Sequence, residues 1–190
     1  AMDTATDIAG LALAEQGQVV AEMTWPARRN HTQQLLPGLL HLLAQAKVDL
    51  EDLDGIIVAQ GPGSFTGLRV GFAIAKGLAY GLGLPLVGVS TLEVEAYQHA
   101  RTGHPICPIL EAGRGEVAAA LFQSPRGRWQ RLRPDQILPP EEVVAWIEHR
   151  TLFCGEMSAS TVALLRERLG HRAVILRGAA RLRRAGFLAE

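Results

Sequence analysis

The order of apolar segments constrains the fold of this chain most strongly. Two strand-like segments, 8–15 and 19–25, flank the short turn at residues 16–18, which is the pattern of a β-hairpin. Helical and strand-like segments then alternate, with helices predicted at 30–46, 66–82 and 91–100 and strands at 55–60 and 86–89. The second half repeats this order, with strands near 106–111, 117–122, 129–133, 152–155 and 174–176, helices near 141–149 and 158–169, and an arginine-rich helix from about 179. Hairpins followed by alternating helices and strands favour α/β lobes with mixed sheets, one plan used twice.

Before the hairpin lies a polar loop, residues 3–7. We expect a strand in front of this loop, and because the chain starts at the end of that strand, we expect the sequence to be clipped at its N-terminus. A chain of 190 residues fits one large domain or two small lobes.

Composition excludes some classes of function. The net charge is zero, so the overall field gives no reason to expect a nucleic-acid or membrane binder. No apolar run is long enough to span a bilayer. Cys107 and Cys154 both lie in apolar, strand-like segments and form no Cys-x-x-Cys pair, which indicates buried, reduced thiols in a cytosolic protein.

A glycine-rich segment, Gly61-Pro-Gly-Ser-Phe-Thr-Gly67, joins a predicted strand to a predicted helix. Such a turn can present backbone N–H groups to an anion. It is not a P-loop, because Gly67 is six residues after Gly61 and Leu68-Arg69 follow where Lys-Ser/Thr is required. The dinucleotide and nucleophile-elbow patterns fail as well, since Thr66 occupies a position that both patterns assign to glycine. A purely structural turn is favoured, and an anion site remains the alternative.

The helix predicted at 66–82 carries two stripes of small residues, each at steps of four. One stripe is Gly67, Gly71, Ala75 and Ala79, and the other is Ala73, Gly77 and Gly81. Each glycine inside a helix costs about 1 kcal/mol relative to alanine. Close approach of another backbone compensates for that cost, so one stripe can face the sheet and the other a partner helix. Burial of both stripes inside the protein is an equally good reading of the pattern.

Other candidate chemistry is sparse. The six histidines form neither His-x-x-x-His nor His-Glu-x-x-His, so we expect no metal site. Asp3, Asp7 and Glu111 could be carboxylates near a cleft, but nothing in the sequence pairs them. Seven arginines fall within 166–184 and could touch RNA phosphates, although a solvated helix face is the favoured reading.

Several segments together resemble one family. In order and spacing these are Asp3-Thr-Ala-Thr6, His31-Thr-Gln-Gln-Leu-Leu-Pro37, Gly61-Pro-Gly-Ser-Phe-Thr-Gly-Leu-Arg69, Gly88-Val-Ser-Thr-Leu92 and Glu111-Ala-Gly-Arg-Gly-Glu116. They are similar to the TsaB (YeaZ) family over about the first two-thirds of the chain. The resemblance implies an α/β fold of the actin-like, sugar-kinase and heat-shock-chaperone ATPase type, with two related lobes. We expect these lobes at 1–102 and 103–190, with the last helix packing back on the first lobe.

The resemblance also implies a function without catalysis. TsaB resembles TsaD, the catalytic protein that transfers a threonylcarbamoyl group to the tRNA adenosine beside the anticodon. The metal-binding His-x-x-x-His of TsaD falls at Thr91 and Glu95 here, and neither residue replaces a histidine. Arg114 stands near the family's arginine, but Glu111 replaces the usual aspartate and Gly113 shifts the match, so no catalytic role is transferred to them. We expect no cofactor and no metal.

The implied partners are TsaD, the ATPase TsaE, and tRNA reached indirectly through the complex. Self-association through the same helices is a further expectation, in a cytoplasmic protein without a membrane anchor. The predicted partner interface is Leu36, Leu39, Leu40, Leu43, Leu68, Gly71, Phe72, Ala75, Leu78 and Ala79. The predicted structural turn is Gly61, Pro62, Gly63, Ser64, Thr66, Gly67 and Arg69.

Two alternatives from other classes remain. A small-molecule kinase or ATPase of the same fold would use the loop of Asp3, Thr4 and Thr6, which are the weak candidates for a nucleotide site. A metallopeptidase is the other alternative, and the absence of a histidine pair argues against it.

Overall fold

The structure, a computed structural model, describes residues 1–28 and 30–190. The chain divides into two compact units, the first formed by residues 1–94 and 184–190 and the second by residues 95–183. The boundary lies inside α3 (Thr91–Tyr97) rather than at residue 102, because Val94 packs in the first unit. The C-terminal segment that carries α6 (Gly186–Ala189) belongs to the first unit.

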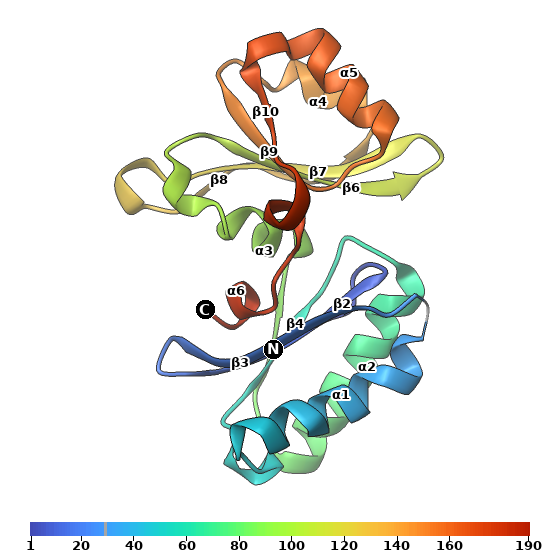
Figure 1. The fold of residues 1–190 in the computed structure, drawn as a ribbon, viewed down its shortest axis with the longest axis vertical. Coiled ribbons are helices and arrows are strands. Elements are labelled where there is room, and N and C mark those ends of the chain that lie inside the picture. Colours follow the sequence, from blue (N-terminus) through green and yellow to red (C-terminus); the bar gives the residue numbers. More distant parts are fainter. Residues whose placement is uncertain (29) are drawn as a thin grey trace. The chain divides into compact units, whose positions relative to one another are not determined.

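The first unit contains a five-stranded mixed sheet in the order β3-β2-β1-β4-β5 (Figure 1). Its strands are β1 (Met2–Asp3), β2 (Ile8–Glu15), β3 (Gln18–Pro26), β4 (Ile56–Ala59) and β5 (Leu86–Val89). β2 is antiparallel to both β1 and β3, whereas β1, β4 and β5 run parallel. The predicted hairpin is confirmed as β2 and β3, and the strand expected before the polar loop is β1.

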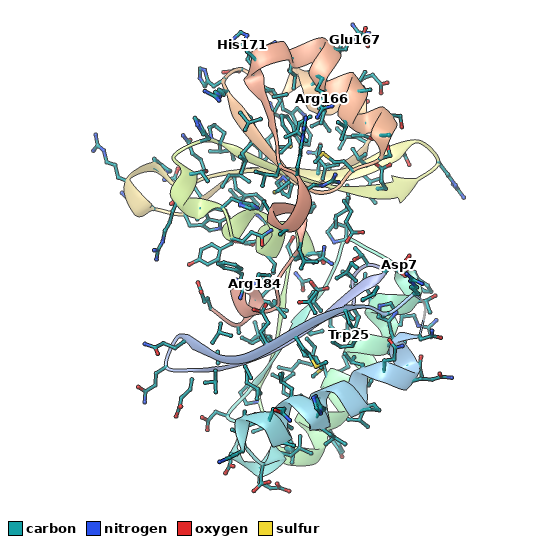
Figure 2. The ribbon with its side chains drawn as sticks, in the orientation of Figure 1. Asp7, Trp25, Arg166, Glu167, His171 and Arg184 are labelled. Atoms are coloured by element: carbon teal, nitrogen blue, oxygen red, sulfur yellow. The ribbon has the colours of Figure 1, made fainter. Side chains whose placement is uncertain are left out.

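Helices α1 (His31–Ala46) and α2 (Phe65–Leu82) cover one face of this sheet, and α6 lies against the other. Side chains alternate along β4, so Ile56 and Val58 join the core under α1 and α2, while Ala59 packs with Leu188 of α6. Trp25 lies on the α1 side (Figure 2), where its indole N–H donates to Gln34 Oε1 at 2.9 Å.

Local sequence explains where α2 begins and ends. Ser64 is its N-cap, and the Ser64 hydroxyl accepts a hydrogen bond from the Gly67 N–H at 3.2 Å. At the other end Gly83 has φ 69°, the left-handed conformation that commonly ends a helix at glycine. The helix predicted at 66–82 is confirmed.

The second unit contains a five-stranded mixed sheet in the order β10-β9-β6-β7-β8. Its strands are β6 (Ile106–Gly113), β7 (Glu116–Gln123), β8 (Gln130–Leu138), β9 (Thr151–Glu156) and β10 (Ala173–Ile175). Strand β7 is antiparallel to β6 and β8, and β9 is parallel to β6 and β10. Helices α4 (Pro140–Ala145) and α5 (Ala159–Leu169) pack on this sheet over a core that includes Ile109, Phe153 and Leu165.

Both units therefore have the same topology. In each, three antiparallel strands are followed by a helix, a parallel strand, a second helix and a second parallel strand. The predicted fold class, two related lobes with mixed sheets flanked by helices, is confirmed.

The final predicted helix is not continuous. Residues 178–181 form a 3₁₀ turn, η5, and α6 starts only at Gly186. Side chains in this segment bond to separate places: Arg181 donates to the carbonyls of Gly155 and Met157, and Arg184 pairs with Glu22. These tertiary bonds take precedence over local helix propensity.

The other 3₁₀ turns are η1 (Leu50–Asp52), η2 (Ala100–Thr102), η3 (Pro125–Gly127) and η4 (Gly170–Arg172). Among the described helices, none is both long and apolar enough to cross a lipid bilayer.

Candidate docking site on the first unit

The polar loop after β1 and the glycine turn before α2 interlock. The Ser64 N–H donates to the carbonyl oxygen of Ala5 at 2.6 Å, and the Thr4 hydroxyl donates to the carbonyl oxygen of Gly67 at 2.8 Å. Asp3 supports the loop by accepting the Ala5 N–H at 2.9 Å. The loop is thus held against the start of α2 by hydrogen bonds in both directions.

Glycine is required at three positions of this contact. A Cβ atom on Gly63 would overlap the carbonyl oxygen of Ala5, and one on Gly67 would overlap the carbonyl oxygen of Thr4. A Cβ atom on Gly71, one turn later, would overlap the Thr4 hydroxyl. The spacing 63–67–71 therefore records the path of the loop across α2, which gives the glycine turn a structural role.

The remaining residues of the predicted turn complete this junction. The Gly61–Pro62 peptide bond is cis, and the Gly61 carbonyl accepts the Thr91 N–H at 2.8 Å. The guanidinium of Arg69 lies 5.2 Å from the centroid of the Phe65 ring. Thr66 lies exposed in the first turn of α2.

The weak candidates for a nucleotide site, Asp3, Thr4 and Thr6, form hydrogen bonds within this loop and to α2. Asp3 and Thr4 are buried, and Thr6 bonds to the backbone of Ile8. The carbonyl oxygen of Thr6 is hydrogen-bonded to Nε2 of the buried His31 at 2.9 Å. A phosphate in this loop would have to displace bonds that the protein makes with itself, so the geometry favours the structural reading over an anion site.

The two small-residue stripes of α2 have opposite surroundings. Gly67, Gly71, Ala75 and Ala79 are buried against the sheet and the loop. Ala73, Gly77 and Gly81 are exposed, and a Cβ atom built on either of these two glycines would meet nothing within 4 Å. One stripe packs inside the unit, and the other is open on its surface.

This division separates the predicted partner interface into three groups. Five of its residues are core residues of the first unit: Leu39, Leu43, Gly71, Ala75 and Ala79. Three are half-buried, namely Leu68, Phe72 and Leu78. Only Leu36 and Leu40, one turn apart on α1, are exposed. The interface as a whole stays a prediction, with Leu36 and Leu40 as the members best placed to contact another protein.

Exposure adds residues that periodicity missed. Tyr80 of α2 is 93% exposed and Phe65 is 73% exposed, and aromatic rings of this size are usually at least partly covered. Helices α1 and α2 contact each other, so these rings, the open stripe, Leu36 and Leu40 belong to one helical layer. The signal in the sequence was the second small-residue stripe, which could not be assigned to an inner or an outer side.

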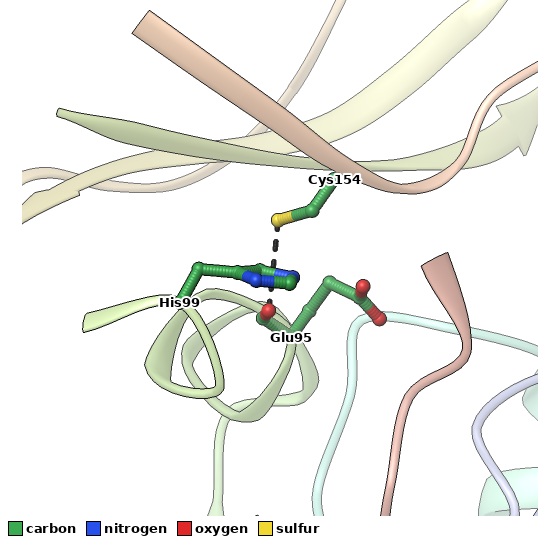
Figure 3. Close-up of side chains that lie close together, drawn as sticks. All are labelled: Glu95, His99 and Cys154. Atoms are coloured by element: carbon green, nitrogen blue, oxygen red, sulfur yellow. Dashed lines mark hydrogen bonds between the residues drawn. The ribbon is translucent and has the colours of Figure 1, made fainter. Parts of the chain in front are cut away.

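Among the described residues, one group of side chains has the spacing of metal ligands, and it lies in the second unit. Ligand atoms of Glu95, His99 and Cys154 lie within 4.8 Å of one another. The Cys154 thiol donates to the backbone carbonyl of Glu95 at 3.5 Å, not to its carboxylate (Figure 3). Nε2 of His99 is buried and has no hydrogen-bond partner among the described residues.

Charge argues against a cation in this cluster. The Glu95 carboxylate is fully buried and lies 3.5 Å from the guanidinium of Arg183, which already balances its charge. Burial raises the pKa of the Cys154 thiol, and the nearby Glu95 carboxylate raises it further. Burial lowers the pKa of His99, which favours the neutral imidazole, so the case against a cation rests on the Glu95–Arg183 pair. The sequence missed the Glu95–Arg183 pair because 88 residues separate its partners.

Glu111 has a structural role in the second unit. Its Oε1 atom accepts the Ser158 N–H at 2.7 Å and the Thr161 hydroxyl at 2.9 Å. The carboxylate therefore occupies the N-terminus of α5, where a bound anion would otherwise be favoured. Arg114, at the tip of the β6–β7 hairpin, has φ 55° and is exposed. Neither Asp7 nor Asp3 belongs to this unit.

Comparison with known proteins places this architecture. The sequence model of the family described as "TsaD: tRNA N6-adenosine threonylcarbamoyltransferase" matches residues 15–158. The Bacillus subtilis protein named "tRNA threonylcarbamoyladenosine biosynthesis protein TsaB" is 32% identical over 178 residues, covering 92% of this chain and 78% of that protein. The Escherichia coli protein of the same name is 38% identical over 146 residues, covering 75% of this chain and 63% of that protein.

The structure of YeaZ from Pseudomonas aeruginosa superimposes with a TM-score of 0.82 and 28% identity, covering 99% of this chain and 86% of that chain. Sequence and structure thus agree on one family across both units. The chain belongs to the TsaB (YeaZ) family and has its two-lobed, actin-like fold.

Proposed function

We propose that this chain acts in the synthesis of threonylcarbamoyladenosine on tRNA, as a non-catalytic subunit that docks the catalytic protein TsaD. The pathway is supported by the names of the relatives, which are called biosynthesis proteins of this nucleoside. The docking role is supported by the helical layer of the first unit.

The observation that carries the docking role is the open stripe of α2. Gly77 and Gly81 each weaken the helix by about 1 kcal/mol relative to alanine, yet a Cβ atom on either would meet nothing within 4 Å. A helix from another protein can approach such a stripe closely, and the contact offsets the cost of the glycines. Leu36 and Leu40 add exposed apolar surface on the neighbouring helix.

Two groups of residues with structural roles support the absence of catalysis. Asp3 and Thr4 are buried and hold the start of α2. Glu95, which stands where the resemblance to TsaD would place a metal-binding histidine, pairs with Arg183. Both sets of side chains serve the fold, which suits a subunit that supports a catalytic partner.

The proposed assembly follows from one surface. TsaD binds the helical layer, TsaE joins that pair, and tRNA is modified by the complex in the cytoplasm. In the absence of TsaD, a second copy of this chain uses the same layer, because that face leaves apolar rings such as Tyr80 in water.

The test is co-expression of this chain with TsaD and TsaE from the same organism, with size-exclusion chromatography and mass spectrometry of the nucleosides from tRNA. Wild-type chain is expected to form a complex and to be required for modification. Gly77→Leu places a bulky side chain on the open stripe, and we expect it to weaken TsaD binding about 100-fold, as loss of a central contact does.

The matched control is Ala163→Leu, which adds the same side chain at an exposed position of α5 in the second unit. It should bind TsaD as the wild type does, and thermal unfolding should show that both variants are folded. Equal TsaD binding by Gly77→Leu and the control would overturn the assigned interface. Modification that proceeds without this chain would overturn the proposed function.

A further inference from the structure

A second surface, in the second unit, is strongly basic. Arg126, Arg128, Arg131 and Arg133 fall within eight residues, and all four are exposed. Arg126 lies on η3, Arg128 directly after it, and Arg131 and Arg133 on β8, which is the last strand of its sheet. The complete chain has zero net charge, so this concentration is a local feature. We call residues 126–133 the basic edge.

The other arginine-rich segment, 166–184, provides a contrast. Arg172 donates to the carbonyl of Ile147, Arg181 to those of Gly155 and Met157, and Arg183 pairs with Glu95. Arg184 pairs with Glu22. Four of the seven arginines in 166–184 therefore bond to other groups of the protein, so the interpretation of this segment as a solvated helix face does not hold for them.

Arginines of the basic edge are oriented by aromatic rings. Arg131 lies 5.1 Å from the centroid of Phe122, and Arg133 lies 5.3 Å from that of Trp146. Trp129 stacks on Phe122 with ring centroids 5.1 Å apart. Stacking uses the flat face of a guanidinium and leaves its N–H donors directed outward, so the ordering cost of binding an anion is reduced.

In the part of the chain that the structure describes, the charge of the edge is neutralised locally only at Arg131. Asp135 is the acidic residue within 124–138, and it bonds Arg131 at 3.0 Å. Among the described residues, no carboxylate is recorded in an ion pair with Arg126, Arg128 or Arg133. Strand pairing is a weaker use of this edge, because Pro134 removes a backbone donor from β8.

Spaced, exposed and preoriented guanidinium groups fit a chain of phosphates, which arginine binds through two parallel hydrogen bonds. We infer that the basic edge binds the phosphate backbone of RNA, and, resting on the proposed function, that this RNA is the tRNA to be modified. Backbone contacts of this kind position an RNA without reading its sequence.

The experiment measures binding of fluorescent, unmodified tRNA by the full chain, alone and with TsaD. Salt is varied between about 50 and 200 mM, because the affinity of phosphate contacts depends on salt. The test variant is R126A/R128A, which leaves the two ring-packed arginines, Arg131 and Arg133, in place. We expect about tenfold weaker binding at low salt and a slope of log K against log salt reduced by about 1 to 2. The variant should lose the same proportion of its affinity for an RNA of scrambled sequence.

The matched control is R166A/R168A, which removes the same charge from exposed positions of α5 in the same unit. It is expected to leave tRNA binding within about twofold of wild type. Unchanged binding by R126A/R128A, or an equal loss in the control, would overturn the inference. Binding of anionic lipid vesicles but not of RNA would also overturn it.

Failure of the proposed function is read separately. R126A/R128A should still co-purify with TsaD, because its substitutions lie outside the first unit. Suppose that the wild-type chain does not bind TsaD, while R126A/R128A binds RNA more weakly than the wild type does. The proposed function then fails, and the RNA-binding surface stands.

Discussion

The two sides of α2 have almost the same composition and opposite surroundings. The inner stripe, Gly67 to Ala79, meets the loop around Thr4, and its glycines leave room for backbone and hydroxyl atoms. The outer stripe, Ala73, Gly77 and Gly81, is exposed, and a Cβ atom on either of its glycines would meet nothing within 4 Å. The comparison teaches that a small residue in a helix permits a close approach, and that only the surroundings show whether another group makes it.

The inner side should be the more sensitive to added volume. We expect Gly67→Ala to lower the free energy of unfolding by about 3 kcal/mol, because its Cβ atom would overlap the Thr4 carbonyl and force the loop to shift. Urea denaturation followed by circular dichroism measures this change. A wild-type midpoint in Gly67→Ala would break the contrast between the two sides.

Removing the hydroxyl at the centre of the interlock should have a smaller effect. Thr4→Val keeps the shape of the buried side chain but leaves the Gly67 carbonyl without its bond from Thr4. We expect a loss of about 1.5 kcal/mol in unfolding free energy, the upper end of the net contribution of one hydrogen bond. Thr6→Val, at a half-buried position of the same loop, is the control and should cost less. Equal costs for the two variants would show that the bond to α2 is not what stabilises the loop.

The outer side should respond in the opposite direction and by the least. Gly77→Ala and Gly81→Ala add a methyl group into open space, so each should stabilise the isolated chain by about 1 kcal/mol through helix propensity. Thermal unfolding of the separated variants tests this expectation. Destabilisation by either alanine would mean that the outer stripe is packed in solution, and self-association would then be the first property to measure.

Much of the fold could be predicted because its signals are local. The hairpin of β2 and β3, the Ser64 cap of α2 and the repeated order of strands and helices each depend on residues close together in the chain. The helix predicted from about residue 179 was wrong as one continuous helix, because its conformation depends on contacts that are distant in the chain. Its arginines bond to distant groups, such as the carbonyl of Gly155, that a local pattern cannot represent.

The candidate site was predictable only in part. Periodicity found both stripes of α2 and the exposed Leu36 and Leu40, but it mixed these with core residues such as Leu39. Helical spacing establishes which residues share a face and does not establish what that face contacts. Periodicity could not find the basic edge either, because the exposure of Arg131 and Arg133 depends on the position of β8 at the end of its sheet.

By itself, the sequence determined the fold class, the resemblance to the TsaB family and the presence of an unusual glycine-rich helix. Tertiary structure decided which side of that helix is open, which arginines are already bonded, and that Glu95 pairs with Arg183. The physical reason is the range of the interactions. Capping, propensity and periodicity act within a few residues, whereas burial and charge pairing depend on groups that only folding brings together.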